Sequence, residues 1–137
     1  MQLHTYLNYG GNCEEAFRFY ETHLGGKITM LMRHGEQPGG SVPREWANAV
    51  LHARIDLGGT ELLGADIPPD RFQPIRSAYL SLTCATDAEA DRVFALLSDS
   101  GQIFMPMQET FFATRFAMLR DRFGTSWMIL CPKPRNG

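Results

Sequence analysis

Residues 2–9 alternate between hydrophobic and polar positions, which is the period-two pattern of a strand with one buried face. Asn12 follows as a predicted N-cap, and apolar residues at helical spacing from Ala16 to Leu24 predict an amphipathic helix. Gly25-Gly26 ends this helix, and residues 28–32 form a second predicted strand. The first part of the chain therefore predicts a strand, a helix and a strand.

This order of elements repeats 75 positions further along the chain, without a gap. Residues 3–7 fall on residues 78–82, and residues 12–28 fall on residues 87–103. The second copy then predicts a strand over 77–84, a helix over 87–97 and a strand over 102–105. Two copies of one pattern predict two similar modules, with a ligand in the crevice between them.

Two further strands complete each copy. In the first copy, residues 48–57 alternate, and a turn at Gly58-Gly59 leads into a strand over 60–64. The second copy ends with strands over 114–120 and 125–131. Residues 35–44 are rich in Gly and Pro and predict a loop, at whose edge His34 is expected to be solvated.

The resulting order, β-α-β-β-β in each copy, predicts the α+β class, with both helices on one face of a curled mixed sheet. We expect a single domain over residues 1–137. It comprises module one at about 2–66, a Pro-rich linker at 67–76 and module two at about 77–132. Because such a sheet leaves its concave face and strand edges poorly covered, we also expect a homodimer.

The alternation assigns each strand residue to one face of the predicted sheet. The residues expected beneath the helices are Leu3, Leu7, Leu80 and Leu82. The opposite, concave face receives His4, Tyr6 and Tyr79, a mixture of polar and aromatic groups that is typical of a small-molecule pocket. We expect Tyr6 and Tyr79 to flank one cavity. His4 could act there as an acid or base, or could simply bond to a neighbour.

Composition narrows the range of partners. The chain has 137 residues, 44% of them hydrophobic and 20% charged, which is ordinary for one globular domain. A net charge of −2 and scattered basic residues give no basis for nucleic-acid binding. No apolar run approaches the ~20 residues that span a bilayer, so we expect no membrane association and a cytoplasmic location.

The three cysteines, Cys13, Cys84 and Cys131, lie far apart and form no C-x-x-C pair, which argues against a disulfide framework and structural zinc. Cys84 and Cys131 lie in apolar runs and are expected in the core. Cys13 begins a predicted helix, where a thiolate would be stabilised. The sequence shows no partner base that would make Cys13 a nucleophile.

Short motifs follow one another in a fixed order along residues 3–132: Tyr6-Leu7, Gly11 to Ala16, Phe19-Tyr20, Leu24 to Gly26, His52-Ala53, Gly58-Gly59, Met105-Pro106, Gln108 to Phe111, Asp121 to Gly124 and Trp127-Met128. In this order and spacing the chain resembles the PhnB-like family of the vicinal-oxygen-chelate superfamily. That superfamily includes glyoxalase I, bleomycin-resistance proteins and extradiol dioxygenases. The resemblance implies a ligand cavity and a dimer.

The resemblance also implies where a metal would be held, since enzymes of that superfamily bind a divalent ion at four strand positions, two per module. These positions fall on His4, Leu63, Tyr79 and Met128. His4 matches the usual first ligand, whereas Leu63 and Met128 replace carboxylates and Tyr79 replaces a histidine. One imidazole, one phenol, a thioether and an alkyl group do not supply the donors that such an ion needs. We therefore predict no glyoxalase-type metal site.

Three further sets of residues are candidates for the ligand pocket. His52 and Arg54 share a strand face, where they could bind an anionic group or pair with acidic residues across the sheet. Glu109 lies beside aromatic residues and could act as a base, cap a turn or pair with Arg115. Trp127 is expected as a wall of the core or of the pocket.

Two functions fit these expectations. The first is a small-molecule-binding protein with its cavity on the concave face and no cofactor. The second is a metal-assisted enzyme, of lyase, isomerase or dioxygenase type, with a rearranged site that uses His4 and either His52 or Glu109. The degenerate metal positions favour the first. Methyltransferase activity is not expected, because the chain has no G-x-G-x-x-G motif and no pattern of a doubly wound parallel sheet.

Overall fold

The computed structural model describes residues 1–37 and 42–134. The chain divides into two compact units, unit 1 (Met1–Pro74) and unit 2 (Ile75–Gly137). The boundary falls within residues 67–76, where the sequence predicts a linker. No helix in the described part of the chain is long and apolar enough to cross a membrane.

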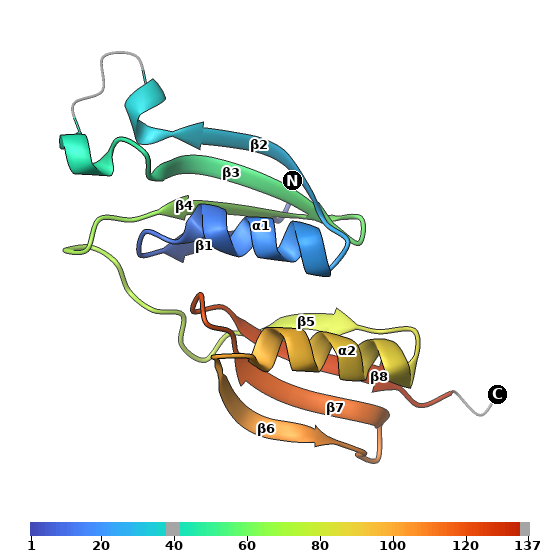
Figure 1. The fold of residues 1–137 in the computed structure, drawn as a ribbon. Helices are drawn as coiled ribbons and strands as arrows, with labels where there is room; N and C mark the ends of the chain where they lie inside the picture. The colour runs from blue at the N-terminus through green and yellow to red at the C-terminus, as the bar shows by residue number, and fades with distance from the viewer. Residues whose placement is uncertain (38–41, 135–137) are drawn as a thin grey trace. The chain divides into compact units, whose positions relative to one another are not determined.

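Unit 1 is a four-stranded mixed sheet with one helix against one of its faces (Figure 1). Its elements are β1 (Thr5–Tyr9), α1 (Cys13–His23), β2 (Lys27–Arg33), the short 3-10 helices η1 (His34–Glu36) and η2 (Arg44–Trp46), β3 (Val50–Leu57) and β4 (Thr60–Asp66). The strand order is β1-β4-β3-β2, in which β1 and β4 are parallel and the other pairs are antiparallel.

Unit 2 repeats this architecture. Its elements are β5 (Leu80–Thr83), α2 (Asp87–Ser98), β6 (Gln102–Gln108), β7 (Ala113–Arg120) and β8 (Ser126–Pro132). The strand order is β5-β8-β7-β6, again with one parallel pair, between β5 and β8. The α+β class and the two β-α-β-β-β modules predicted from the sequence are confirmed.

The repeat of 75 residues holds for the first and third elements of each unit, whereas α2 begins 74 positions after α1. β5 begins 75 positions after β1, and β6 begins 75 positions after β2. β2 and β6 also share an irregularity of strand pairing at the equivalent place, between Ile28 and Met30 and between Ile103 and Met105. The same local bend is therefore built into both sheets.

The units differ in the connection that follows. Residues 34–49 join β2 to β3, whereas residues 109–112 suffice between β6 and β7. The loop predicted over residues 35–44 overlaps η1 and reaches the first residue of η2, while its residues 38–41 lie outside the described residues. The longer connection is thus a feature of unit 1 alone.

The core of unit 1 lies between α1 and the sheet. Phe17 of α1 is completely buried, and removal of such a side chain from water contributes roughly 1.5–3 kcal/mol. Gly64 of β4 allows this close approach, because a Cβ atom there would lie 2.8 Å from Cζ of Phe17. Helix and sheet are therefore in direct contact at this point.

A buried carboxylate joins α1 to the sheet. Asp66 ends β4 and is 2% exposed. Its Oδ1 accepts hydrogen bonds from the backbone N–H groups of Gly11 at 3.1 Å and Cys13 at 2.9 Å, and its Oδ2 accepts one from Val50 at 2.8 Å. The predicted N-cap Asn12 makes no side-chain capping bond. The start of α1 is therefore capped from a distant strand.

Unit 2 caps its helix locally. Thr86 Oγ1 accepts a hydrogen bond from the backbone N–H of Glu89 at 3.1 Å, and Glu89 Oε1 accepts one from Ala85 at 3.2 Å. This reciprocal arrangement is a capping box. The equivalent helices of the two units thus begin by different means.

The first strand of each unit is shorter than the sequence predicts. β1 begins at Thr5, and Leu3, which we expect beneath the helix, is instead 98% exposed. The ladder to β4 starts at the pair Thr5–Leu62, so the residues before Thr5 lie outside the sheet. Leu7 is buried as predicted, at 5% exposure.

In unit 2, the strand predicted over 77–84 is confined to β5. Leu80 and Leu82 are half-buried and pair with Trp127 and Ile129, two buried residues of β8. The face that the alternation assigns to these leucines is therefore the helix face.

Replacement of Asp66 by alanine should lower the free energy of unfolding by about 3 kcal/mol or more, because three backbone N–H groups would lose a charged acceptor. Urea denaturation followed by circular dichroism measures this loss. The exposed Asp70 provides a matched control, since Asp70→Ala should change stability by no more than about 0.5 kcal/mol. Equal midpoints for the two variants would contradict the role of Asp66.

Candidate functional site

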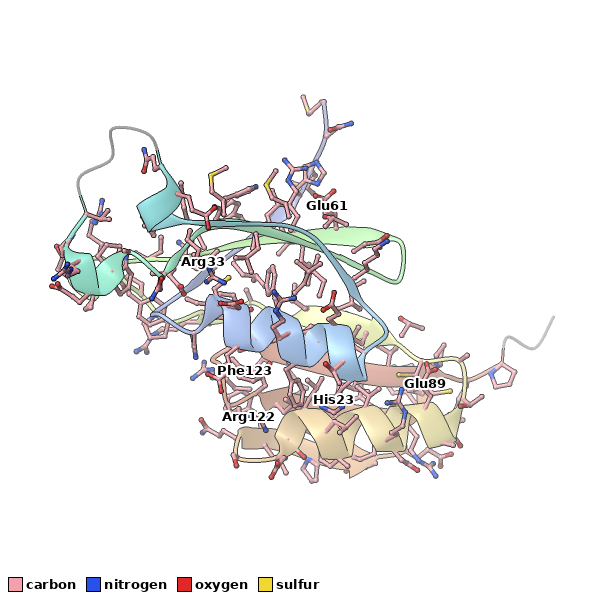
Figure 2. The ribbon with its side chains drawn as sticks, turned by 45° about the horizontal axis from the view of Figure 1, so that its top comes forward. His23, Arg33, Glu61, Glu89, Arg122 and Phe123 are labelled. Carbon is pink, nitrogen blue, oxygen red and sulfur yellow. The ribbon has the colours of Figure 1, made fainter. Side chains whose placement is uncertain are left out.

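The face of the unit 1 sheet that points away from α1 carries most of the predicted site residues, and we call it the open face of unit 1. Tyr6, His52, Arg54 and Glu61 lie on it, from strands β1, β3 and β4. Each alternates with a buried residue on the helix side. Figure 2 shows Glu61 turned away from α1.

The opposite side of the sheet is tied to the helix. Arg33 of β2, also labelled in Figure 2, donates to both carboxylate oxygens of Glu14 in α1, at 2.7 and 3.0 Å. These bonds from Arg33 hold the pKa of the Glu14 carboxyl below its ordinary value. Arg33 therefore serves the helix contact, and the open face keeps a separate set of charges.

The four side chains of the open face form one hydrogen-bonded chain. The hydroxyl oxygen of Tyr6 lies 3.2 Å from Nδ1 of His52, and the two rings are stacked with centroids 5.7 Å apart. Arg54 Nε donates to Nε2 of His52 at 3.3 Å, and Arg54 Nη1 donates to Oε1 of Glu61 at 3.0 Å. Arg54 thus pairs with an acidic residue across the sheet and also orients the imidazole.

Sequence reasoning missed Glu61. Arg54 pairs with Leu63 in the ladder between β3 and β4, which makes Glu61 its diagonal neighbour on the same face. The tight turn at Gly58-Gly59 sets this register, so the signal that could have identified Glu61 is the hairpin itself.

The contact with Arg54 indicates which ring nitrogen of His52 carries a hydrogen. A guanidinium Nε–H can only donate, so Nε2 of His52 must accept and carries no hydrogen. The neutral imidazole then carries its hydrogen on Nδ1 and donates it to the phenolic oxygen of Tyr6. The hydroxyl hydrogen of Tyr6 remains available to another acceptor.

Tyr6 keeps that hydrogen over a wide range of pH. Burial raises the pKa of the Tyr6 phenol. The phenol is therefore a hydrogen-bond donor and not a base. His4, which the sequence also predicts for this site, is exposed and lies before the start of β1.

The corresponding face of unit 2 is aromatic. Tyr79 precedes β5, and its ring meets Phe104 edge to face with centroids 6.4 Å apart. Arg120 places its guanidinium carbon 5.5 Å from the centroid of Phe104 and donates to the carbonyl of Ile75 at 3.0 Å. Sequence reasoning missed Phe104 and Arg120. The expectation that Tyr6 and Tyr79 flank one cavity stays a prediction.

Trp127 lies in the core of unit 2, which is one of the two places expected for it from the sequence. It is 1% exposed and lies on the helix face of β8, in register with Leu80. Its indole N–H donates to Oδ2 of Asp121 at 2.9 Å. Because Asp121 is itself buried, the indole is a required partner of the carboxylate.

Glu109 directly follows β6, in the connection to β7. Its side chain is 69% exposed, and its carboxylate lies 3.9 Å from Nζ of Lys133. Arg115, the partner expected for Glu109, instead donates through Nε to Asp91 at 3.0 Å. An exposed carboxylate beside a lysine gives no support to a role as a base.

The four positions at which the resemblance implies a metal do not fit one. His4 and Leu63 belong to unit 1, and Tyr79 and Met128 belong to unit 2. The alkyl group of Leu63 and the thioether of Met128 are unsuited to a hard or borderline divalent ion. Within residues 1–37 and 42–134, no group of three or more His, Cys, Asp or Glu side chains could hold a metal ion. That the protein carries no such metal stays a prediction.

The cysteines are free and buried. Burial raises the pKa of the Cys13 thiol far above its ordinary value, and the charges of Asp66 and Glu14 raise it further. Burial and the neighbouring Glu89 raise the pKa of Cys84 to about 11. The position of Cys13 at a helix start therefore does not produce a thiolate, because burial and, after it, the nearby carboxylates favour the neutral thiol.

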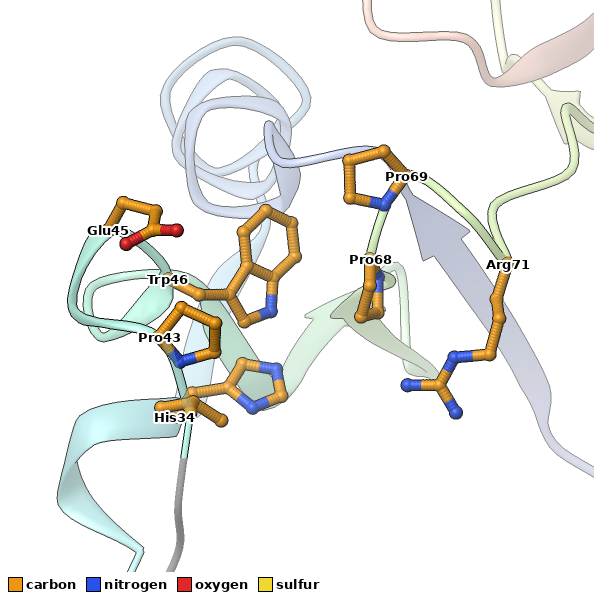
Figure 3. Close-up of a pocket in the computed structure, with 8 residues that line it drawn as sticks. His34, Pro43, Glu45, Trp46, Pro68, Pro69 and Arg71 are labelled. Atoms are coloured by element: carbon orange, nitrogen blue, oxygen red, sulfur yellow. The ribbon is translucent and has the colours of Figure 1, made fainter.

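Unit 1 also contains a cavity of about 610 Å³ beside the connection between β2 and β3 (Figure 3). Its lining residues are His34, Val42, Pro43, Glu45, Trp46, Pro68, Pro69 and Arg71. The prediction that His34 is solvated is wrong. His34 is half-buried, and its ring lies 6.1 Å from that of Trp46. The sequence gives no sign that residues 34–46 and 68–71 meet, beyond the abundance of proline in both.

The two β-α-β-β-β units define the class of protein. A glyoxylase/bleomycin resistance protein/dioxygenase domain from Frankia sp. EAN1pec superposes with a TM-score of 0.67, at 16% identity, over 97% of this chain and 98% of that one. Likeness at this identity shows the fold alone. The chain thus has the fold of the glyoxalase/bleomycin resistance/dioxygenase superfamily.

More similar proteins identify the family. The family model described as 3-demethylubiquinone-9 3-methyltransferase matches residues 1–130. Protein PA1353 from Pseudomonas aeruginosa is 36% identical, with a TM-score of 0.88 over 98% of this chain and 99% of that one. A Bacillus cereus protein named as a putative 3-demethylubiquinone-9 3-methyltransferase, PhnB protein, is 30% identical, with a TM-score of 0.81 over 96% and 99%. Protein YjdN of Escherichia coli K12 is 30% identical over 94% of each chain. The chain belongs to this PhnB-like family, as its motifs indicate.

The raised thiol pKa of Cys13 predicts how stability depends on pH. A group whose pKa is higher in the folded state stabilises the fold below its unfolded pKa, about 8.5 for a thiol, and loses this contribution as pH rises. The free energy of unfolding should therefore fall above about pH 8.5, and less steeply in Cys13→Ala. Urea denaturation at several pH values measures both slopes. The same slope in the variant would assign the loss to another group.

Proposed function

We propose that the chain binds a small, uncharged organic molecule on the open face of unit 1, with Tyr6 donating a hydrogen bond to a carbonyl-type oxygen. The observation that carries this proposal is the chain Tyr6–His52–Arg54–Glu61. In this chain Nε2 of His52 already accepts a hydrogen bond from Arg54, and Nδ1 donates to Tyr6. The hydroxyl hydrogen of Tyr6 can therefore be donated to a ligand.

The surroundings of Tyr6 suit an apolar, planar body. Met32 pairs with His52 and Met30 pairs with Arg54, so both methionines share the open face. Tyr6, Met30 and Met32 are 49%, 41% and 40% exposed. Methionine adapts its shape to a guest, and its sulfur packs well against aromatic rings. These three side chains offer contact area beside the one directed donor.

The charge balance supports a neutral ligand. The guanidinium of Arg54 is the only cation in the hydrogen-bonded chain, and Glu61 neutralises it at 3.0 Å. An anionic ligand would have to compete with Glu61 for Arg54. A ketone, amide or quinone-like oxygen needs only the hydroxyl of Tyr6.

We do not propose methyl transfer for this chain, although the family description and the Bacillus cereus relative carry that name. Each unit is a mixed four-stranded sheet with a single helix of at least eight residues in the described chain, not the doubly wound parallel sheet of nucleotide-binding folds. The metal-assisted alternative is disfavoured by the donors at His4, Leu63, Tyr79 and Met128. Binding without chemistry is what the residues support.

We also propose that the protein is a homodimer. Leu3 and Phe111 are 98% and 91% exposed, and each sheet has two edge strands within its own unit. Apolar side chains and strand edges of this kind are commonly covered by a second copy related by two-fold symmetry.

The proton assignment and the role of Tyr6 can be tested together. In protein with 15N-labelled histidine, the ring of His52 should show a protonated Nδ1 and an unprotonated Nε2 before any ligand is added. Acetophenone, a neutral aromatic ketone, should then shift the backbone amide signals of Tyr6 and His52. Tyr6→Phe should weaken this binding by about tenfold, the effect of one lost hydrogen bond of about 1.4 kcal/mol.

Tyr9 is the matched control, since it lies on the same strand but is buried on the helix side at 2% exposure. Tyr9→Phe should leave the affinity for acetophenone unchanged. A proton on Nε2 of His52 would contradict the proton assignment. Acetophenone shifts that do not involve the open face would contradict the proposed site.

Light scattering tests the oligomeric state. At micromolar concentration the protein should have twice the mass of one chain. Leu3→Asp and Phe111→Asp should each reduce that mass if the exposed side chains lie in the dimer contact, and Asp70→Ala should not. A single-chain mass for the unaltered protein would exclude the homodimer.

A further inference from the structure

We infer that the cavity beside the β2–β3 connection is a second ligand site, lined by residues different from those of the open face, and that it binds a planar organic carboxylate. Its volume of about 610 Å³ lies within the range of small-molecule sites, roughly 300–1,000 Å³. No residue of the chain Tyr6–His52–Arg54–Glu61 contributes to its lining.

One wall of the cavity is fixed by short backbone hydrogen bonds. His34 donates its backbone N–H to the carbonyl of Ala49 at 2.9 Å, and Gly35 donates to the carbonyl of Ala47 at 2.8 Å. The backbone N–H of Trp46 donates to Pro43 at 2.9 Å. Gly35 suits this close approach, because a Cβ atom there would lie only 3.0 Å from Cβ of Ala47. The rings of His34 and Trp46 are therefore held by a defined backbone.

The facing wall is a proline-containing turn. Pro68 accepts hydrogen bonds from the backbone N–H groups of Arg71 at 2.9 Å and Phe72 at 3.0 Å. Proline has few conformations to lose, so a wall that contains Pro68 and Pro69 is ordered before a ligand arrives. Together with Pro43 and the indole of Trp46, these rings make the site apolar and suited to a flat body.

Two nitrogen atoms of the cavity lining lack a hydrogen-bond acceptor. Nε1 of Trp46 and Nε2 of His34 are buried and have no hydrogen-bond partner among the residues that the structure describes. A buried polar group without a partner costs about 1–3 kcal/mol. An indole N–H can only donate, and His34 can donate through Nε2. Because neighbouring atoms cover both nitrogens, a ligand must shift the lining slightly, and the hydrogen bonds gained offset that cost.

The charged residues set the orientation of the ligand. Figure 3 shows Arg71 on one side of the cavity and Glu45 on the other, with the indole nitrogen of Trp46 turned toward Pro68. A carboxylate is therefore favoured at the side of Arg71, where guanidinium and carboxylate pair, and disfavoured beside Glu45. The apolar body then lies against Trp46 and the prolines. This polarity distinguishes the cavity from the open face, where Glu61 already neutralises Arg54.

Benzoate provides the test. The chain has two tryptophans, so the 15N–1H spectrum of the full-length protein contains two indole signals, and Trp46→Phe identifies the one from Trp46. Millimolar benzoate should shift the Trp46 indole signal. Trp127 is the internal control, because its N–H already donates to Asp121 in the core, and its signal should not move.

Two comparisons examine the chemistry of the site. Arg71→Gln should weaken benzoate binding at least about threefold, the effect of one partly exposed ion pair. Benzamide has the same shape without the charge, and it should bind the unaltered protein and Arg71→Gln equally. A Trp46 signal that does not move, or that responds to benzoate equally in Arg71→Gln, would overturn the inference.

Tyr6→Phe separates this site from the open face. The response of Trp46 to benzoate should persist in that variant, whereas the binding of acetophenone should weaken. If Tyr6→Phe removed the Trp46 response as well, the cavity would not be an independent site, and the inference would fail while the proposal for the open face stood.

Discussion

The fold of unit 1 depends on one buried carboxylate. The carboxylate of Asp66 accepts hydrogen bonds from three backbone N–H groups, two at the start of α1 and one at the start of β3. A carboxylate at 2% exposure would be strongly destabilising unless such donors replaced its water. The last residue of β4 therefore fixes where α1 begins, and with it which face of the sheet is covered and which stays open. Burial raises the pKa of the neighbouring Cys13 thiol, and the charge of Asp66 raises it further.

Period-two alternation and the 75-residue repeat were sufficient to predict both modules and to place Leu7 and Tyr6 on opposite faces. What they could not predict depends on register between segments far apart in sequence. Leu3 is exposed because the ladder to β4 begins only at Thr5. Trp127 faces the core because its place in β8 is set by pairing with β5 and by the carboxylate of Asp121. The pair Arg54–Glu61 is different, because it lies within one hairpin and the predicted turn at Gly58-Gly59 could have identified Glu61.

The two units share a scaffold and differ in its chemistry. Tyr6 and Ser81 occupy equivalent positions in the repeat, so unit 2 has no phenol at the site where unit 1 presents its donor. The open face of unit 2 instead places Arg120 against Phe104, with its guanidinium bonded to the chain at Ile75. Among the residues that the structure describes, the combination of a phenol that can donate and a neighbouring ion pair on the open face belongs to unit 1. The preference for a neutral ligand proposed for the open face therefore comes from side chains that differ between the two units, and not from the duplicated β-α-β-β-β fold.

The connection between β2 and β3 shows a second way in which the copies have diverged. Unit 2 passes from β6 to β7 through residues 109–112, and the longer segment of unit 1 adds the walls that carry His34 and Trp46. These residues contribute nothing to the sheet core, and they bury two ring nitrogens without a partner in the described chain. The carboxylate inferred for the cavity would supply an acceptor for these nitrogens. The cavity is thus an addition to the fold, and its chemistry can vary without disturbing Asp66 or the strands that depend on it.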